Sequence, residues 1–308
     1  MIIGHCIIQH PVNLFRIAWC GRLHWLTSEI FYNMPLFFFL SGYYYHCEEY
    51  GLYIRKKFLR VFLPYLIWAA VNDLLYVFGG SLVHETISLK EGIIAYLTGD
   101  HLWFLYTLFV VFLIYPWIEK IPYGSVALCA VCILLPEFCR SLSGQVGSVI
   151  MYLPFFIAGH LCHKHGLLEK GRVVALISDH PVGTFLVCVL SAAVIRYIYD
   201  ISGSFFVKFI GGFPTFFGLY LITKLPALKK DSLLSRAFIK MGQYSLQIYL
   251  LNFYIIPVMK VLVCRLLGIE DPLVIIVSFT LVCIIPVVFA CDLVIKKSKF
   301  LRLAFGMP

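Results

Sequence analysis

The segment PLVIIVSFTLVCIIPVVFACDLVI at residues 272–295 decides the fold class, because it holds a single charged residue, Asp292. An apolar stretch of about 20 residues is long enough for a helix to cross the hydrocarbon layer of a membrane. A helix is also stable there, since it bonds its backbone N–H and C=O groups within the segment. We therefore predict a transmembrane helix at 272–295.

Apolar segments of this kind recur from one end of the chain to the other, with only short polar breaks between them. The 308 residues are 61% hydrophobic and 13% charged, whereas about a quarter of the residues of a soluble domain are charged. The sequence predicts an all-α integral membrane protein in which residues 1–308 form one domain, a bundle of about ten transmembrane helices. The other predicted spans are 30–46, 58–79, 102–118, 125–139, 148–162, 182–199, 204–223 and 241–264.

The first apolar fragment, MIIGHCIIQH at residues 1–10, is too short to cross a bilayer. The alternation of charge described below nevertheless requires a crossing there, so we expect the first helix to be truncated at its N-terminus. Either the true start codon lies upstream or the gene has lost the first half of this helix. A cleaved signal peptide fits poorly, because no basic segment precedes the apolar residues.

The basic residues gather at the ends of apolar segments rather than along one polar face. The net charge of +9 therefore indicates membrane topology and not nucleic-acid binding. Loops rich in Lys and Arg lie on the cytoplasmic side, and here they alternate along the chain, which predicts about ten crossings with both termini inside. These loop residues are Arg55, Lys56, Lys57, Arg60, Lys120, Lys164, Lys170, Arg172, Lys224, Lys229, Lys230, Arg236, Lys240, Lys296, Lys297, Lys299 and Arg302.

Ionisable residues inside membrane spans are candidates for function, because they are costly there unless paired or hydrated. Arg196 and Lys260 lie near span ends, where a long side chain reaches the interface, and a structural role is favoured for them. Asp73 and Asp292 lie deeper in their spans. Each is either a member of a buried polar pair or a site residue. The full set is His5, Asp73, His101, His160, Arg196, Lys208, Lys260 and Asp292.

His5 follows a glycine within an apolar stretch. A neutral imidazole at this position could remove a proton from a hydroxyl group, since its unperturbed pKa is about 6.5. A hydrogen-bonded histidine that only packs is the alternative.

Two further segments carry candidate binding residues. The run NMPLFFFLSGY at 33–43 has the pair Ser41–Gly42 inside its span, where a helix can bend and let its backbone approach a ligand; core packing is the alternative. The basic group at 55–60 precedes Pro64 and could bind the phosphates of a nucleotide-containing donor, with Arg60 as its strongest member. Anchoring at the cytoplasmic surface explains the same group equally well.

Two apparent metal motifs are weak. Cys129 and Cys132 have ligand spacing but lie in an apolar span without a second pair. The run His160-Leu-Cys162-His163-Lys164-His165 offers imidazoles, yet adjacent helical positions do not converge on one point. We predict no metal site.

The motifs in their order along the chain resemble the acyltransferase 3 family. They are Gly4-His5, then the run at 33–43, then Arg55-Lys56-Lys57 and Arg60 before Pro64-Tyr65, then Leu102-Trp103-Phe104-Leu105, and finally Gly242-Gln243-Tyr244-Ser245-Leu246-Gln247-Ile248-Tyr249-Leu250-Leu251-Asn252. The resemblance covers nearly the whole chain, and the segments around Met34-Pro35 and from Ser245 to Leu251 are its most specific parts.

The resemblance implies a multi-pass enzyme of the plasma (inner) membrane that transfers an acyl group to a hydroxyl of a surface polysaccharide or glycolipid. Acetyl-CoA or another acyl-CoA is then the donor substrate, no cofactor stays bound, and the partners are acyl-CoA, a carbohydrate or lipid-linked glycan acceptor and membrane lipid. His5 matches the family's catalytic histidine, whereas the arginine that precedes it in the family would fall before Met1. The residues expected to bind the donor or the acceptor are Arg60, Ser41, Trp103, Tyr249, Asn33 and Asn252.

Asn33 and Asn252 stand where family members often have histidine. Asparagine can hydrogen-bond but cannot act as a base, so the catalytic assignment falls to His5 alone. Two other functions remain open. A transporter or flippase of lipid-linked glycans also fits a helical bundle with buried polar groups, although no inverted repeat is visible. An inactive truncated remnant of an acyltransferase fits the short first helix.

Overall fold

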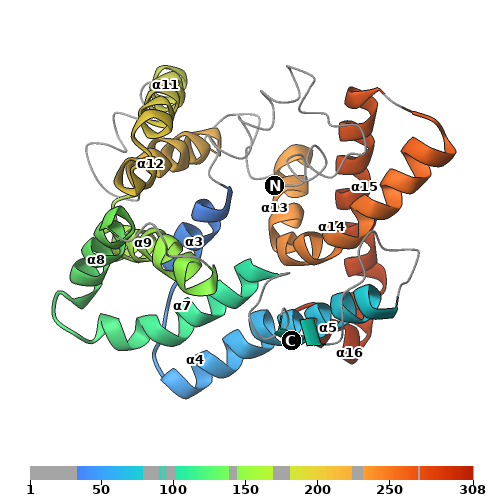
Figure 1. Ribbon diagram of the computed structural model, residues 1–308, viewed down its shortest axis with the longest axis horizontal. Helices are drawn as coiled ribbons and strands as arrows, with labels where there is room; N and C mark the ends of the chain where they lie inside the picture. The colour runs from blue at the N-terminus through green and yellow to red at the C-terminus, as the bar shows by residue number, and fades with distance from the viewer. Residues whose placement is uncertain are drawn as a thin grey trace. The chain divides into compact units, whose positions relative to one another are not determined.

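The structure is a computed structural model that describes residues 33–78, 90–91, 93–94, 102–138, 144–168, 181–223, 232–269 and 271–307. These residues are helical or lie in turns and short connections, and they contain no strand (Figure 1). The helices are α3 Asn33–Tyr43, α4 Tyr50–Lys57, η3 Phe58–Phe62, α5 Leu63–Phe78, α7 Trp103–Glu119, α8 Gly124–Phe138, α9 Gly144–Lys164, α11 Pro181–Ser202, α12 Phe205–Ile222, α13 Leu233–Gln243, α14 Ser245–Met259, η6 Lys260–Leu266, α15 Pro272–Leu293, η7 Ile295–Lys297 and α16 Lys299–Ala304.

The all-helical prediction is confirmed, since each predicted span from 30–46 to 272–295 overlaps a helix. Within the described residues, three helices are long and apolar enough to cross a membrane, namely Gly144–Lys164, Val182–Ser202 and Leu273–Lys297. The bent pair Ser245–Asn252 and Tyr254–Val263 makes a fourth if it is one span. Shorter apolar helices lie at Met34–Tyr43, Trp103–Glu119, Gly124–Glu137 and Phe205–Leu221. The described helices therefore give a membrane-type fold without establishing all the predicted crossings.

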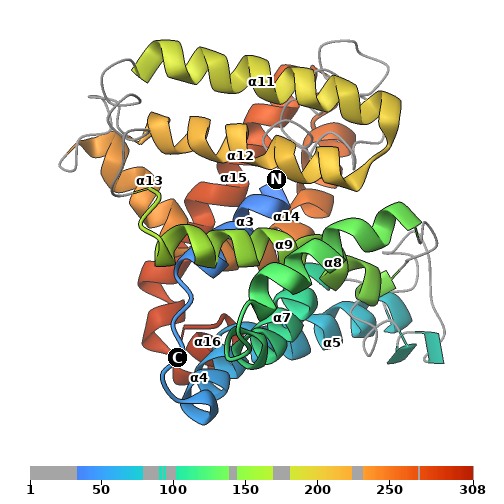
Figure 2. The same cartoon turned by 90° about the vertical axis from the view of Figure 1, so that its left-hand side faces the viewer.

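The chain divides into two compact units, residues 1–36 with 169–297 and residues 37–168 with 298–308. In the first unit α11 and α12 form an antiparallel pair that lies side by side in Figure 2. Gly218 of α12 permits this approach, because a Cβ there would already lie 3.3 Å from the Cβ of Cys188. Almost all residues of α11 are at least partly exposed, as expected of a helix that is surrounded by lipid.

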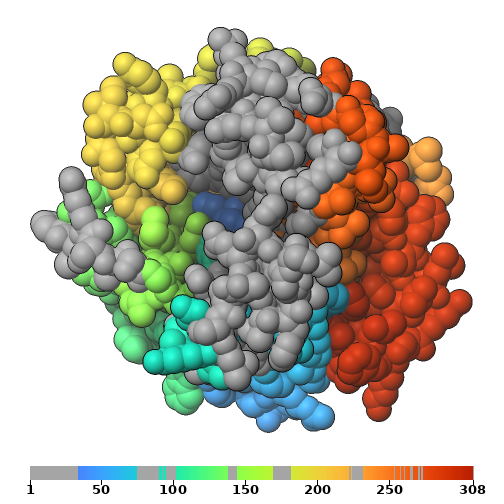
Figure 3. Space-filling model, turned by 45° about the vertical axis from the view of Figure 1, so that its right-hand side comes forward, coloured from blue at the N-terminus to red at the C-terminus, as the bar shows by residue number. Residues whose placement is uncertain are grey.

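Helix α15 has two opposite apolar faces. Ile275, Phe279, Cys283 and Cys291 are at most 1% exposed, and several of them pack against α14 and η6. At the same spacing, Leu273, Val277, Leu281, Ile285, Phe289 and Leu293 are all about half exposed. The C-terminal helices accordingly present uncovered surface, orange to red in Figure 3. A helix that is apolar all round and keeps such a stripe exposed is suited to lipid rather than to water.

Helix α14 bends by 47° between its two apolar halves, Ser245–Asn252 and Tyr254–Val263. Pro257 explains the bend, because it has no N–H to give to the carbonyl of Phe253 four residues earlier. The predicted single span at 241–264 is thus a broken helix, with its break directly after Asn252.

The structure adds a helix, α13, within the stretch between the predicted spans 204–223 and 241–264. Its N-terminus is capped by Ser232, whose Oγ accepts a hydrogen bond from the Ser235 N–H at 3.0 Å. Leu233, Leu234 and Phe238 are exposed on its apolar side, and Arg236 and Lys240 supply its charge. This helix was not predicted from the sequence, because Arg236 and Lys240 were assigned to a cytoplasmic loop.

In the second unit, α3 and α9 cross with their backbones in contact at two glycines. A Cβ on Gly42 would lie 1.9 Å from the carbonyl oxygen of Phe156, and one on Gly159 would lie 1.9 Å from that of Phe39. Real atoms do not approach this closely, so only glycine fits at both positions. Gly42 therefore serves helix packing, which was the alternative to an approach of the backbone to a ligand.

We expect Gly159→Ala to lower the free energy of unfolding by about 2 kcal/mol or more, since the new methyl group forces α3 and α9 apart. Equilibrium unfolding in mixed micelles measures this change. Gly51→Ala is the matched control, because Gly51 is a helical glycine with nothing within 4 Å of an added Cβ. It should raise stability by about 0.5–1 kcal/mol through helix propensity. Equal effects of the two substitutions would contradict the close crossing.

Candidate functional site

The basic residues of α4 and η3 lie on a helix that aromatic side chains hold against α7. The Tyr50 hydroxyl donates a hydrogen bond to the Leu113 carbonyl at 3.3 Å, and the Phe62 ring stacks on Phe109 with ring centroids 4.4 Å apart. With this face used for packing, Arg55, Lys56 and Arg60 are exposed. The arrangement leaves their guanidinium and ammonium groups free to meet an anionic ligand.

Arg60 sits in a π-helical turn, Phe58–Phe62. Pro64 accounts for this turn, since it cannot donate a hydrogen bond to the carbonyl of Arg60 four residues before it. Such widened turns occur preferentially at functional sites. The sequence signal was present in the spacing from Arg60 to Pro64, but its structural consequence was not predicted.

Lys57 differs from its neighbours because its side chain is half-buried. Its Nζ lies 4.1 Å from the centre of the Phe112 ring and 5.3 Å from that of Tyr53. Burial, followed by repulsion from Arg60, lowers the pKa of Lys57 to about 8. Contact with the two aromatic faces stabilises the charged form of Lys57 and so opposes part of this decrease.

Trp103 belongs to an aromatic cluster at the start of α7. Its ring contacts Tyr152 of α9, with centroids 5.3 Å apart, and Tyr152 stacks on Phe38 of α3 at 4.9 Å. Trp103 itself is only half-buried, and so is Ser41 on α3. Trp103, Ser41 and Arg60 thus lie in the same unit, on three different helices.

Tyr249 and Asn252 lie one turn apart on α14, in the other unit. Asn252 is 3% exposed, and its Oδ1 accepts no hydrogen bond from the described part of the chain. A buried amide oxygen of this kind is costly unless a ligand or water satisfies it. His5 and the side chain of Asn33 lie outside the described residues. The other predicted site residues fall into two sets, Ser41, Arg60 and Trp103 in one unit and Tyr249 and Asn252 in the other.

A polar cluster, formed by Tyr45, Tyr53, Glu119 and His160, was not predicted as a site. Glu119 Oε1 lies 3.2 Å from His160 Nε2, and the rings of Tyr45 and His160 meet edge to face at 5.0 Å. His160 was recognised only as an ionisable residue and as part of a weak metal motif. The cluster could not be read from the sequence, because its members come from four separate segments of the second unit.

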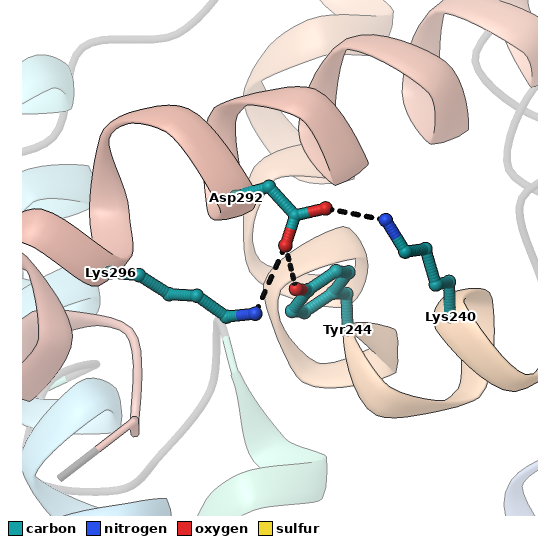
Figure 4. Close-up of polar contacts among 4 residues, drawn as sticks. All are labelled: Lys240, Tyr244, Asp292 and Lys296. Carbon is teal, nitrogen blue, oxygen red and sulfur yellow. Dashed lines mark hydrogen bonds and ion pairs between the residues drawn. The ribbon is translucent and has the colours of Figure 1, made fainter.

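Asp292, which was left open between a polar pair and a site residue, links α15 to Lys240 and the C-cap residue Tyr244 of α13 and to Lys296 of η7 (Figure 4). Its Oδ2 accepts from Lys240 at 2.8 Å, and its Oδ1 accepts from Lys296 at 3.0 Å and from the Tyr244 hydroxyl. Both carboxylate oxygens are therefore used within the protein. This is the pattern of a structural link between helices, and the polar-pair interpretation holds for Asp292.

Arg196 likewise forms an ion pair, with Asp200 one turn later at 2.7 Å, as its position near a span end suggested. In the regions that the structure describes, no three His, Cys, Asp or Glu side chains are close enough together to hold a metal ion.

We predict that an amine-reactive reagent at pH 7.5 labels Lys57 faster than Lys56. At this pH, a pKa of about 8 leaves Lys57 with a neutral fraction roughly two hundred times that of an ordinary lysine. Mass spectrometry of labelled peptides at short times measures both rates in one sample. Faster labelling of the exposed Lys56 would contradict the depressed pKa.

We also predict that Asp292→Asn speeds amide hydrogen exchange in Leu233–Gln243 severalfold, because Lys240 and Lys296 would then repel each other without an anion between them. Asp271→Asn is the matched control. It removes a charge from the other end of α15, where asparagine still caps the helix by accepting from the Val274 N–H. Unchanged exchange in α13 after Asp292→Asn would show that the link does not hold this helix.

Comparison with known proteins gives one match. A sequence profile of the acyltransferase 3 family, described as Acyltransferase domain, matches residues 1–291. No curated protein and no solved structure matches the chain.

Proposed function

The chain belongs to the acyltransferase 3 family, and from this premise we propose that it transfers an acyl group, in the first instance acetyl, from acyl-CoA to a hydroxyl of a cell-surface polysaccharide or glycolipid. The family match carries the general activity. The donor, the acyl group and the acceptor are the parts that we propose.

The exposed basic turn supports the choice of an acyl-CoA donor. CoA carries several phosphate groups, and Arg55, Lys56 and Arg60 offer them guanidinium and ammonium donors on a helix fixed by aromatic packing. Arginine is the stronger phosphate ligand because its planar fork binds two oxygens at once. We assign the phosphates to Arg60. This residue lies near the start of the predicted span 58–79, at the end that the basic residues predict to be cytoplasmic.

In the reaction, the acceptor hydroxyl oxygen attacks the thioester carbonyl carbon, a C–O bond forms and the C–S bond breaks. His5 takes the hydroxyl proton as general base, and CoA leaves as a thiolate that takes up a proton. Alternatively, His5 carries the acyl group transiently before the acceptor attacks it. Ser41, Trp103, Tyr249, Asn33 and Asn252 line the path of the acyl group or bind the acceptor in this proposal.

Membrane placement completes the proposal. The enzyme crosses the plasma (inner) membrane about ten times, as the alternation of basic loops requires. Its long apolar helices and their exposed apolar stripes support this placement.

The test is transfer of labelled acetyl from acetyl-CoA into envelope glycans by membranes that contain the chain. We expect His5→Ala to abolish transfer, while His165→Ala, which alters an exposed histidine, leaves it unchanged. Arg60→Ala should raise the KM for acetyl-CoA about tenfold, since it removes a charged hydrogen-bonding group. Arg236→Ala controls for the loss of one exposed cation.

Full transfer by His5→Ala would remove His5 from the site, and an unchanged KM in Arg60→Ala would remove Arg60. Movement of a lipid-linked glycan without consumption of acyl-CoA would favour the transporter.

A further inference from the structure

Helix α13 keeps large apolar side chains exposed along one side. Leu234, Phe238 and Met241 follow one another at the spacing that places side chains on one face of a helix. Leu234 is 49% exposed and Phe238 is 54% exposed, and every residue of α13 is at least partly exposed. A face of this kind is unfavourable in water, so another medium or a partner covers it.

The other side of α13 is polar and basic. Ser235, Arg236 and Gln243 lie there by the same helical spacing. Arg236 is exposed, and none of the ion pairs among the described residues involves it. In the sequence, the stretch 224–243 holds five basic residues and a single acidic one, Asp231. The charge around α13 therefore favours an anionic partner.

Two connections place α13 at the boundary of the membrane. Only Tyr244 separates its last residue from α14, the helix with the two apolar halves. At the same end, Lys240 Nζ donates to Asp292 Oδ2 at 2.8 Å, and the Tyr244 hydroxyl donates to Asp292 Oδ1 (Figure 4). Asp292 lies one turn before Lys296, among the basic residues that mark the predicted cytoplasmic end of α15. The C-terminal end of α13 is thus fixed where α14 begins and α15 ends.

Length and composition together decide how α13 meets the membrane. Its 11 residues are too few to cross the hydrocarbon layer, which takes about 20. A helix with one apolar face and one basic face instead lies in the plane of the interface. The cytoplasmic leaflet is rich in anionic lipids, and each basic residue near that surface adds to the attraction. Both faces of α13 then have a suitable environment.

We infer that α13 lies flat on the cytoplasmic surface of the membrane and binds anionic phospholipid headgroups. Leu234, Phe238 and Met241 enter the outer part of the acyl-chain layer, and Arg236 meets the phosphate groups. The ligand is membrane lipid and not the acyl donor. This contact is therefore separate from the donor phosphate site proposed at Arg60, and it leaves the KM for acetyl-CoA unchanged.

A photo-reactive residue identifies what covers the apolar side. The full chain carries p-benzoylphenylalanine in place of Phe238, in vesicles of equal parts phosphatidylcholine and phosphatidylglycerol. We expect illumination to attach phospholipid to α13, which mass spectrometry of the peptides detects. The matched control carries the same residue in place of Ile239, which is 50% exposed on the other side of the helix and should take up severalfold less lipid.

A cross-link from position 238 to a second copy of the chain or to another protein would overturn the inference and make the apolar side a protein interface. Equal lipid attachment at both positions would overturn it as well, because α13 would then have no lipid-facing side.

Amide hydrogen exchange in the same vesicles gives a second readout. Phe238→Asn should speed exchange in Leu233–Gln243 about five- to tenfold, because a half-exposed phenylalanine loses its burial in lipid. Ile239→Asn brings a comparable change in helix propensity and should alter the rate by less than about twofold. Equal acceleration by the two substitutions would contradict the orientation of the helix.

The charge of the lipid tests the headgroup assignment. In vesicles of phosphatidylcholine alone, exchange in α13 should be about fivefold faster than in the mixed vesicles, the effect of one cation near an anionic surface. Arg236→Gln should remove most of this difference. Arg302→Gln, which removes an exposed cation from α16, should preserve it. Equal exchange of the wild type in the two kinds of vesicle would overturn the anionic headgroup as the ligand.

Discussion

The absence of water in the hydrocarbon layer is the constraint on which the rest of this structure depends. It forces every spanning backbone into a helix, and the exceptions are informative because each leaves polar groups to be satisfied otherwise. Two exceptions coincide with residues assigned to the site. Pro64 frees the carbonyl of Arg60 within a π-helical turn, and Pro257 breaks α14 next to the buried Asn252. Both prolines thus disturb their helices beside residues that the proposed function assigns to the substrates.

Two polar clusters at helix ends hold segments of the chain together in different ways. Around Asp292, both carboxylate oxygens are paired, and the donors come from Lys240, Tyr244 and Lys296. Around His160, the Glu119 carboxylate lies 3.2 Å from the imidazole Nε2, and the ring of Tyr45 meets that of His160 edge to face. The first cluster joins helices through one fully paired carboxylate. The second joins segments of the chain mainly through contacts between aromatic rings.

Much of the fold could be predicted from the sequence, because hydrophobic length depends on local composition. The apolar run at 272–295 became α15. Arg55, Lys56 and Arg60 of the basic group at 55–60 are exposed, as both a phosphate ligand and a surface anchor require, so the choice between these two roles stays open. Helix α13 was missed because its basic residues were assigned to a loop, although Ser232 and the spacing of Leu234 and Phe238 could have revealed it. The role of Gly42 was left open, since only the tertiary crossing with α9 distinguishes packing from ligand approach. The contacts of Tyr45, Glu119 and His160 depend on segments far apart in the chain, so no local pattern could predict them.

The central claim is that an acyl donor enters from the cytoplasmic side and that its phosphates bind Arg60 of η3. Sealed membrane vesicles of opposite orientation test it most directly, because acetyl-CoA does not cross the bilayer. Inside-out vesicles, which expose the cytoplasmic face, should consume external labelled acetyl-CoA and acetylate their glycan, whereas right-side-out vesicles should do so only after permeabilisation. Equal transfer by intact vesicles of both orientations, or transfer by right-side-out vesicles alone, would contradict the account.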